Sequence, residues 1–298
     1  MRAIDASLGK LNGPDLENQA LALKGMIQLQ DLGQPKEALA TFEELARRQR
    51  DLDQSDALMR VQQALCHAAL GDLPGARAVL QEIVRADSAN AMPAFAGARR
   101  PQQPADIGWS RARFHLAELD LIAGQYDQAR DGFAALAEQA PEDRLSNDCL
   151  DIALLLNETA GSDDAALKTY GATRQARLLR DRKKLHEELD AIVRDHAQSP
   201  LAPVALFELA VELADEHDTA GAIARYAELV SQHHDHRLAA RALESIGDLQ
   251  VQVLHQLDLA VASYERLLTD YPEDLFLDGV RKKLLAARAA KGETHATP

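Results

Sequence analysis

Apolar residues recur at helical spacing along most of the chain, and residues 114–141 show the pattern most clearly. Gly124 interrupts it, and Ala129, Phe133 and Leu136 follow five, nine and twelve residues later on one helical face. Glycine allows the backbone to reverse, and a small alanine lets two helices approach closely. Because the segment ends on a proline, which cannot continue a helix, it predicts a helical hairpin: a first helix, a turn at Gly124 and a second helix.

The same frame recurs at five more places, with an alanine five residues after the turn and an aromatic residue or leucine nine residues after it. A further turn around residue 180 would place Leu185, Leu189 and Ile192 at the same offsets. A single hairpin cannot bury its apolar face alone, so we expect the hairpins to stack on one another. The predicted turn residues are Gly33, Gly71, Gly124, Gly161, Arg180, His217 and His255.

Composition agrees with this pattern, because 46% of residues are hydrophobic while only 4% are aromatic, and alanine and leucine dominate. We therefore predict an all-α fold: an α-solenoid superhelix of helix-turn-helix repeats with about 12–14 helices. Glycines and prolines after residue 87 predict a long loop. The expected organisation is a partly ordered N-terminal cap at 1–17, repeats one and two at 18–86, an inter-repeat loop at 87–108, repeats three to six at 109–290 with an extra degenerate hairpin near 165–197, and a frayed tail at 291–298.

A helix over residues 275–290 is expected to close the stack, with one face buried and one face in water. The side chains predicted to point inward are Leu275, Val280, Leu284 and Leu285, and those predicted to point outward are Arg281, Lys282 and Lys283.

The chain resembles the tetratricopeptide repeat family, whose hairpins of about 34 residues carry an alanine and an aromatic residue four apart in the second helix. Pro141 and Pro272 match the closing proline of that repeat, whereas the tryptophan motif of its first helix is missing. Segments 195–202 and 264–274 resemble bacterial members, including envelope proteins of the outer-membrane assembly and cell-division coordinator kind. The resemblance implies a non-catalytic scaffold or adaptor that binds a protein or peptide and needs no cofactor.

In such a stack the first helices line the concave side, and residues four apart on them face the groove. Most of these positions are apolar, which favours an apolar or amphipathic peptide as ligand. The alternative is that they pack between neighbouring first helices. The predicted partner-binding residues are Val61, Leu65, Arg111, Phe114, Glu118, Phe207 and Val211.

Two polar clusters have competing interpretations. Arg174, Arg177, Arg180 and Lys184 would bind an acidic segment or a phosphate, or they form the solvated face of a long helix. His233–His236 has metal-ligand residue types and would suit a metal-dependent hydrolase. Adjacent residues diverge, however, so we expect a solvated loop there and no metal site.

Charge and cysteine content narrow the function further. The chain has 33 basic and 47 acidic residues, a net charge of −14 that disfavours nucleic acid. Cys66 and Cys149 are too few for a disulfide framework, and we expect two buried thiols. No long apolar run suits a membrane span or a leader, so we expect a cytoplasmic chain, or a periplasmic one if a leader was removed. Self-association, as a structural region of a larger envelope or secretion-related protein, is the alternative function.

Overall fold

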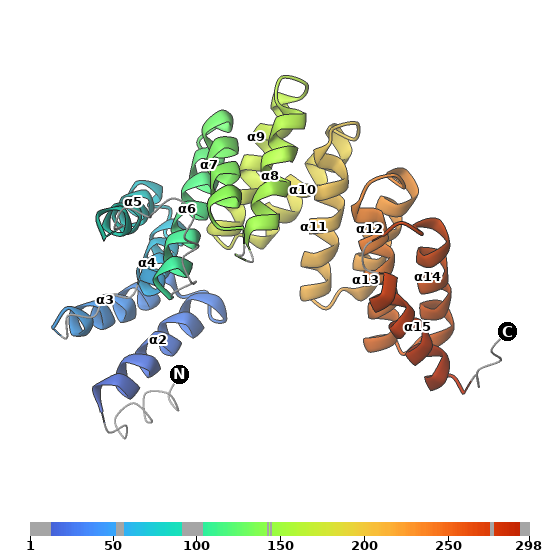
Figure 1. The fold of residues 1–298 in the computed structure, drawn as a ribbon, viewed down its shortest axis with the longest axis horizontal. Helices are drawn as coiled ribbons and strands as arrows, with labels where there is room; N and C mark the ends of the chain where they lie inside the picture. Colours follow the sequence, from blue (N-terminus) through green and yellow to red (C-terminus); the bar gives the residue numbers. More distant parts are fainter. Residues whose placement is uncertain are drawn as a thin grey trace. The chain divides into compact units, whose positions relative to one another are not determined.

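The computed structural model describes residues 13–51, 57–90, 104–141, 143, 145–274 and 277–292. These residues form fourteen helices and no strand (Figure 1). The helices are α2 (Pro14–Gln30), α3 (Pro35–Asp51), α4 (Ala57–Ala69), α5 (Leu73–Asn90), α6 (Pro104–Ile122), α7 (Tyr126–Gln139), α8 (Leu145–Thr159), α9 (Asp164–Leu178), α10 (Arg182–Asp195), α11 (Leu201–Asp215), α12 (Thr219–Gln232), α13 (Leu238–Gln252), α14 (Leu257–Asp270) and α15 (Leu277–Ala290).

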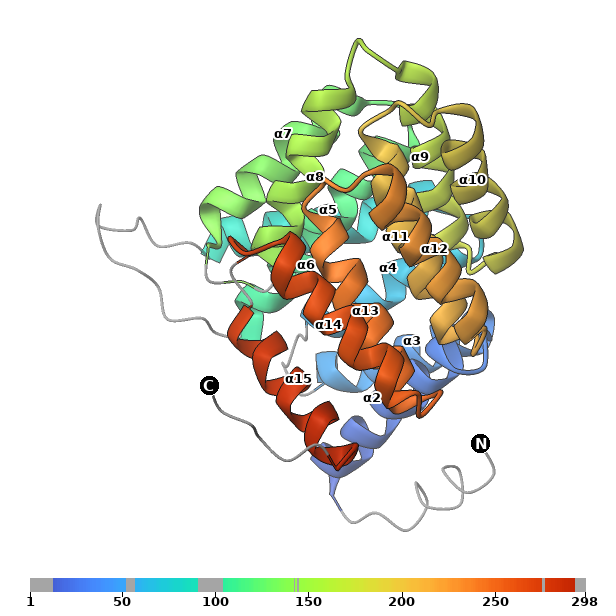
Figure 2. The same cartoon turned by 90° about the vertical axis from the view of Figure 1, so that its right-hand side faces the viewer.

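The chain divides into two compact units, Met1–Leu185 and His186–Pro298, called the N-terminal unit and the C-terminal unit. The helices pack in sequence order: α2 with α3, α4 with α5 and α6 with α7 in the first unit, and α11 with α12 and α13 with α14 in the second. The second helices α3, α5, α7, α12 and α14 also pack against the helix that follows each of them, and Figure 2 shows α13, α14 and α15 side by side. The predicted all-α fold of stacked hairpins is therefore confirmed within each unit.

Every predicted turn residue has a left-handed backbone. The φ angles are 58° at Gly33, 83° at Gly71, 74° at Gly124, 74° at Gly161, 56° at Arg180, 64° at His217 and 53° at His255. Such angles suit glycine and are strained for residues with a Cβ atom. The repeat therefore requires a left-handed turn residue at seven positions. At three of them, Arg180, His217 and His255, that residue is not glycine.

The second helices bury the positions that the repeat frame specified. The alanine of each hairpin is at most 1% exposed, and the aromatic residue or leucine that follows it is at most 4% exposed. These pairs are Ala38 and Phe42, Ala76 and Leu80, Ala129 and Phe133, Ala166 and Tyr170, Ala222 and Tyr226, and Ala260 and Tyr264. Leu185, Leu189 and Ile192 of the hairpin predicted around Arg180 are buried as well.

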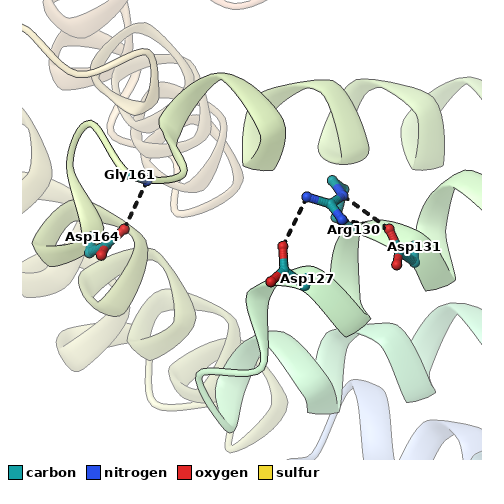
Figure 3. Close-up of polar contacts among 5 residues, drawn as sticks. All are labelled: Asp127, Arg130, Asp131, Gly161 and Asp164. Carbon is teal, nitrogen blue, oxygen red and sulfur yellow. Dashed lines mark hydrogen bonds and ion pairs between the residues drawn. The ribbon is translucent and has the colours of Figure 1, made fainter.

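Aspartates fix the start of several second helices. The Asp163 side chain caps α9 by accepting a hydrogen bond of 3.0 Å from the Ala166 amide. Asp164 in turn accepts one of 3.1 Å from the amide of Gly161, which ties the turn to the helix (Figure 3). Asp72, Asp181 and Asp218 bind the amides of Gly75, Lys184 and Gly221 in the same way. A short acidic side chain just after four of the seven turns therefore satisfies amides that the helix leaves free.

The first and second helices approach most closely where the first helix has glycine. A Cβ atom on Gly25 would lie 2.6 Å from the Phe42 ring, and one on Gly247 would lie 2.4 Å from the Tyr264 ring. Both distances are shorter than a side chain tolerates, so each aromatic ring occupies space that only glycine leaves free.

Helices α5 and α6 extend into the loop expected at 87–108. Helix α5 continues to Asn90, and α6 begins at Pro104, where the missing amide hydrogen costs no helical bond. Gly108 does not end α6, because it allows the helix to approach α4: a Cβ there would lie 2.6 Å from that of Ala57. Residues 91–103 lie outside the described residues, as does most of the expected cap at 1–17, whose last residues belong to α2.

The terminal helix differs from its predicted orientation at two positions. Val280 and Leu284 are buried as expected, but Leu285 is 44% exposed. Lys283 does not face only water, because its ammonium group pairs with carboxylates of α13. The spacing of leucines did not distinguish adjacent Leu284 and Leu285. Leu275 lies outside the described residues.

Replacing His217 by glycine is expected to raise the free energy of unfolding by about 0.5–1 kcal/mol, because glycine adopts the left-handed conformation without a Cβ penalty. The converse change, Gly124→Ala, is expected to lower it by about 1 kcal/mol. Urea unfolding followed by circular dichroism measures both. Loss of stability in His217→Gly would contradict the assignment of strain to this turn.

Candidate functional site

The predicted partner-binding residues of the N-terminal unit lie on α4 and α6, which pack against each other. Val61 is completely buried, Glu118 is 6% exposed, and Leu65 and Phe114 are partly buried. The Phe114 ring makes an edge contact with Phe133, with ring centres 5.4 Å apart. A partner could reach parts of this surface but not Val61, whose side chain belongs to the core. Arg111, on the same helix as Phe114, is exposed.

Helix α9 lies across this surface. It packs mainly against α6, and more lightly against α4 and against α8, the helix that precedes it. Gly171 faces the end of α6, where a Cβ atom would lie 3.0 Å from the Leu121 carbonyl oxygen. Leu178 packs against the apolar cluster of α4 to α6 that includes Leu65, and the Arg180 guanidinium donates to the Gln30 carbonyl oxygen of α2 at 3.2 Å. The chain therefore covers part of its own first-helix surface.

A buried ion cluster joins α9 to α6. Glu118 Oε2 lies 2.8 Å from His115 Nδ1, and Glu118 Oε1 lies 3.9 Å from Arg174 Nη1. The Arg174 guanidinium also lies over the Tyr170 ring, 4.8 Å from its centre. Burial by itself would raise the pKa of Glu118, but the hydrogen bond with His115 and the charges of His115, Arg174 and Arg177 lower that pKa below its usual value. The carboxylate is therefore held ionised within the protein.

The four residues of the predicted basic patch do not all face solvent together, which differs from the arrangement expected. Arg174 faces inward to Glu118, because α9 turns that side toward α6. Arg177 and Arg180 are exposed, and Lys184 is partly exposed at the start of α10. Two residues predicted to bind separate partners, Glu118 and Arg174, thus neutralise each other. Sequence spacing could not indicate this pairing, since it depends on how α9 crosses α6.

The corresponding surface of the C-terminal unit is built by α11 and α13. Phe207 and Val211, one turn apart on α11, are partly buried and pack against the core of the unit. The Phe207 ring meets Tyr226 edge-on at 5.3 Å, and the exposed Arg241 of α13 lies over it at 5.2 Å. Both predicted residues of this unit are therefore partly exposed at the surface.

Carboxylates lie along one side of this apolar pair. Glu208 and Glu212 on α11 are partly exposed, Asp215 and Glu216 follow as exposed residues, and Glu216 Oε1 lies 3.8 Å from His186 Nε2. The surface combines a small apolar strip with an acidic border, which suits a ligand that carries both apolar and cationic groups.

A second ion cluster connects α13, α14 and α15. Lys283 Nζ lies 2.7 Å from Glu244 Oε1 and 2.6 Å from Asp248 Oδ2, and the Tyr264 hydroxyl donates to Asp248 Oδ1 at 2.7 Å. Burial by itself would lower the pKa of Lys283, but these hydrogen bonds raise it. Burial and the Asp248 contact also raise the pKa of Tyr264. The cluster joins the last three helices and has no unusual proton affinity suited to catalysis near pH 7.

Two loops of the C-terminal unit, together with α13 and α14, line an open cavity of about 550 Å³. The Tyr271 hydroxyl donates to the His234 carbonyl oxygen at 2.9 Å, and Arg266 pairs with Asp270 at 3.0 Å. His236 Nδ1 accepts from the Leu238 amide at the start of α13. The cavity is lined by His234, Asp235, His236, Arg237, Ala240, Arg266, Asp270, Tyr271, Pro272, Glu273 and Asp274.

Two histidines near this cavity, His233 and His236, are partly buried. Burial lowers the pKa of His233 and of His236, so both imidazoles are neutral at pH 7. Among the residues with described positions, no three histidine, cysteine or carboxylate side chains converge as metal ligands.

Cys66 and Cys149 are buried and unpaired, and burial raises the pKa of each thiol to about 12, which makes both poor nucleophiles.

Replacing Glu118 by alanine is expected to lower the free energy of unfolding by about 3 kcal/mol, because Arg174 and His115 would lose their buried acceptor. Asp127→Ala removes one of the two exposed partners of Arg130 (Figure 3) and is expected to change stability by less than about 1 kcal/mol. Since the pKa of Glu118 is lowered on folding, its contribution is complete above the unfolded pKa of about 4.3 and disappears as pH falls through the folded value.

Urea unfolding at pH 7 and at acidic pH measures this dependence with Glu118→Gln as the comparison. The gap in stability between the natural chain and Glu118→Gln should narrow on acidification. A constant gap would contradict the ionised state of Glu118.

A comparison with protein families finds that residues 27–91, in the first two hairpins, match the model of the tetratricopeptide repeat. No curated protein matches the chain. Within the described residues, no helix has both the length and the apolar character needed to cross a membrane. The matched segment runs from the last turn of α2 to the end of α5, and later hairpins repeat its turn and its buried alanine and aromatic positions. Together these findings support a TPR-like protein.

Proposed function

We propose that this chain is a non-catalytic scaffold that binds a partner protein or peptide through the first-helix surface of its C-terminal unit. Tetratricopeptide repeats generally mediate binding between proteins, and their first helices line the binding surface. One observation carries the choice of unit: α9 packs against α6, the helix of Phe114, whereas α11, the helix of Phe207 and Val211, packs mainly against its own hairpin partner α12 and the next first helix α13. An enzyme built on His233–His236 has no support, since no metal-ligand group forms among the described residues.

Two phenylalanines provide a matched test. Phe114 and Phe207 occupy the same position before their turns and make the same edge contact with an aromatic residue of the second helix. Replacing either by alanine should cost similar stability, but Phe207→Ala should weaken partner binding at least about tenfold while Phe114→Ala leaves it within about twofold. Affinity capture from the source organism, followed by titration of the captured partner, measures this. Equal losses in both variants would overturn the choice of unit.

A second candidate function is self-association. Leu150 and Leu154, one turn apart on α8, are 49% and 51% exposed, an unusual position for large apolar side chains. If this strip pairs two copies, light scattering should show a mass that increases with concentration, and Leu154→Glu should abolish that increase. Leu259→Glu is the control, because Leu259 is also 51% exposed but lies on α14. A monomer at all concentrations would exclude self-association.

The finer assignments suggested by the resemblance remain predictions. A role in a bacterial envelope, and a cytoplasmic or periplasmic location, rest on segments 195–202 and 264–274 and on the lack of a long apolar run. Fractionation of the source organism with an antibody against the chain would decide the location.

A further inference from the structure

Helix α8 packs differently from the first helices α2, α4, α6, α11 and α13, each of which has a close second helix after it in the chain. It packs closely against α7, the helix before it, but only lightly against α9, which lies mainly on α6. In the hairpin of α6 and α7, Ala117 lies seven residues before the turn and faces the second helix, where a Cβ atom on Gly132 would lie 3.1 Å from its own. Leu154 has the same position before Gly161 and is 51% exposed. The side of α8 that a second helix would cover is therefore open.

Four side chains form a strip on this open side, called the α8 strip. Asn147, Leu150, Leu154 and Asn157 follow one another at spacings of three, four and three residues, which places them on one face of the helix. All four are exposed, and none of them is charged. The α8 strip therefore has two leucines at its centre and one amide side chain at each end.

The order of side chains in the α8 strip is the same in both directions along the helix. An antiparallel second copy of α8, related by a two-fold axis at the level of Ile152, would place Leu150 of one copy against Leu154 of the other. The same axis would place Asn147 against Asn157, where each amide can both donate and accept a hydrogen bond. A strip that matches itself in this way fits a second copy of the chain, because an unrelated helix would not require the symmetry.

We propose that α8 pairs with α8 of a second copy through the α8 strip, in an antiparallel contact with two-fold symmetry. This inference rests on the second candidate function, self-association, and specifies how the two copies meet. A single pair of helices lies at the small end of specific interfaces, so the dimer should form and separate with concentration. Each copy carries a net charge of −14 while the strip is neutral, so added salt should strengthen the dimer by screening the repulsion between copies.

Engineered cysteines distinguish this pairing from others. Asn147 and Asn157 are ten residues apart, about 15 Å along a helix, so a cysteine at either position cannot reach the same position of the other copy across the axis. A mixture of Asn147→Cys chains and Asn157→Cys chains should form a disulfide-linked dimer when oxidised with diamide. Each variant alone should give at least about tenfold less, as measured by gel electrophoresis without reductant.

Two controls accompany the mixture. Asp127→Cys, at an exposed site on α7, should give little linked dimer when mixed with Asn157→Cys. The natural cysteines, Cys66 and Cys149, are buried, so the unaltered chain should give none. Leu154→Glu added to both members of the mixture should abolish the linked dimer, because it places two carboxylates in the contact.

Equal linkage within each single variant would indicate a parallel pairing and overturn the proposal, as would linkage in the mixture that persists with Leu154→Glu. If light scattering detects a dimer but the mixture is not linked, self-association stands and the proposed pairing is wrong. A monomer at all concentrations would overturn both.

Discussion

The contact between an aromatic residue of the second helix and a small residue of the first helix supports the rest of this structure. It is tightest in the first and last complete hairpins, where the rings of Phe42 and Tyr264 occupy the space left by Gly25 and Gly247. Because the two helices of a hairpin pack this closely, the chain must reverse between them within a few residues, and each reversal contains one residue with a left-handed backbone. Residues as unsuited to that conformation as His217 and His255 are tolerated because packing on both sides determines the path of the chain.

Repetition of this contact builds units that resemble each other, yet the two units have different surfaces. In the N-terminal unit the first-helix surface receives α9, and the buried carboxylate of Glu118 is compensated by His115 and Arg174 from within the chain. In the C-terminal unit the equivalent strip on α11 keeps its apolar residues partly exposed beside an acidic border. A repeat protein can thus use one scaffold both to stabilise itself and to present a surface to other molecules.

The polar groups of the molecule are mostly engaged in holding helices together. Lys283 joins α15 to α13, aspartates cap the second helices, and His236 binds the start of α13. The pKa shifts of Glu118, Lys283 and Tyr264 favour the charge states that these residues already have near neutral pH, so they stabilise contacts between helices. This distribution of charge agrees with a scaffold, whose surfaces recognise other molecules.

The sequence by itself determined the hairpins, because their features are local: a left-handed turn, an alanine five residues later and a large apolar residue nine residues later lie within one or two helices. The sequence pattern also located the turn at Arg180, where the residue with the left-handed backbone is an arginine and not a glycine. Only the tertiary structure decided that α9 lies on α4 and α6, that Arg174 faces Glu118, and that Lys283 points to α13. These contacts join residues far apart in the chain, and helical periodicity specifies which face of a helix is buried but not which neighbour buries it.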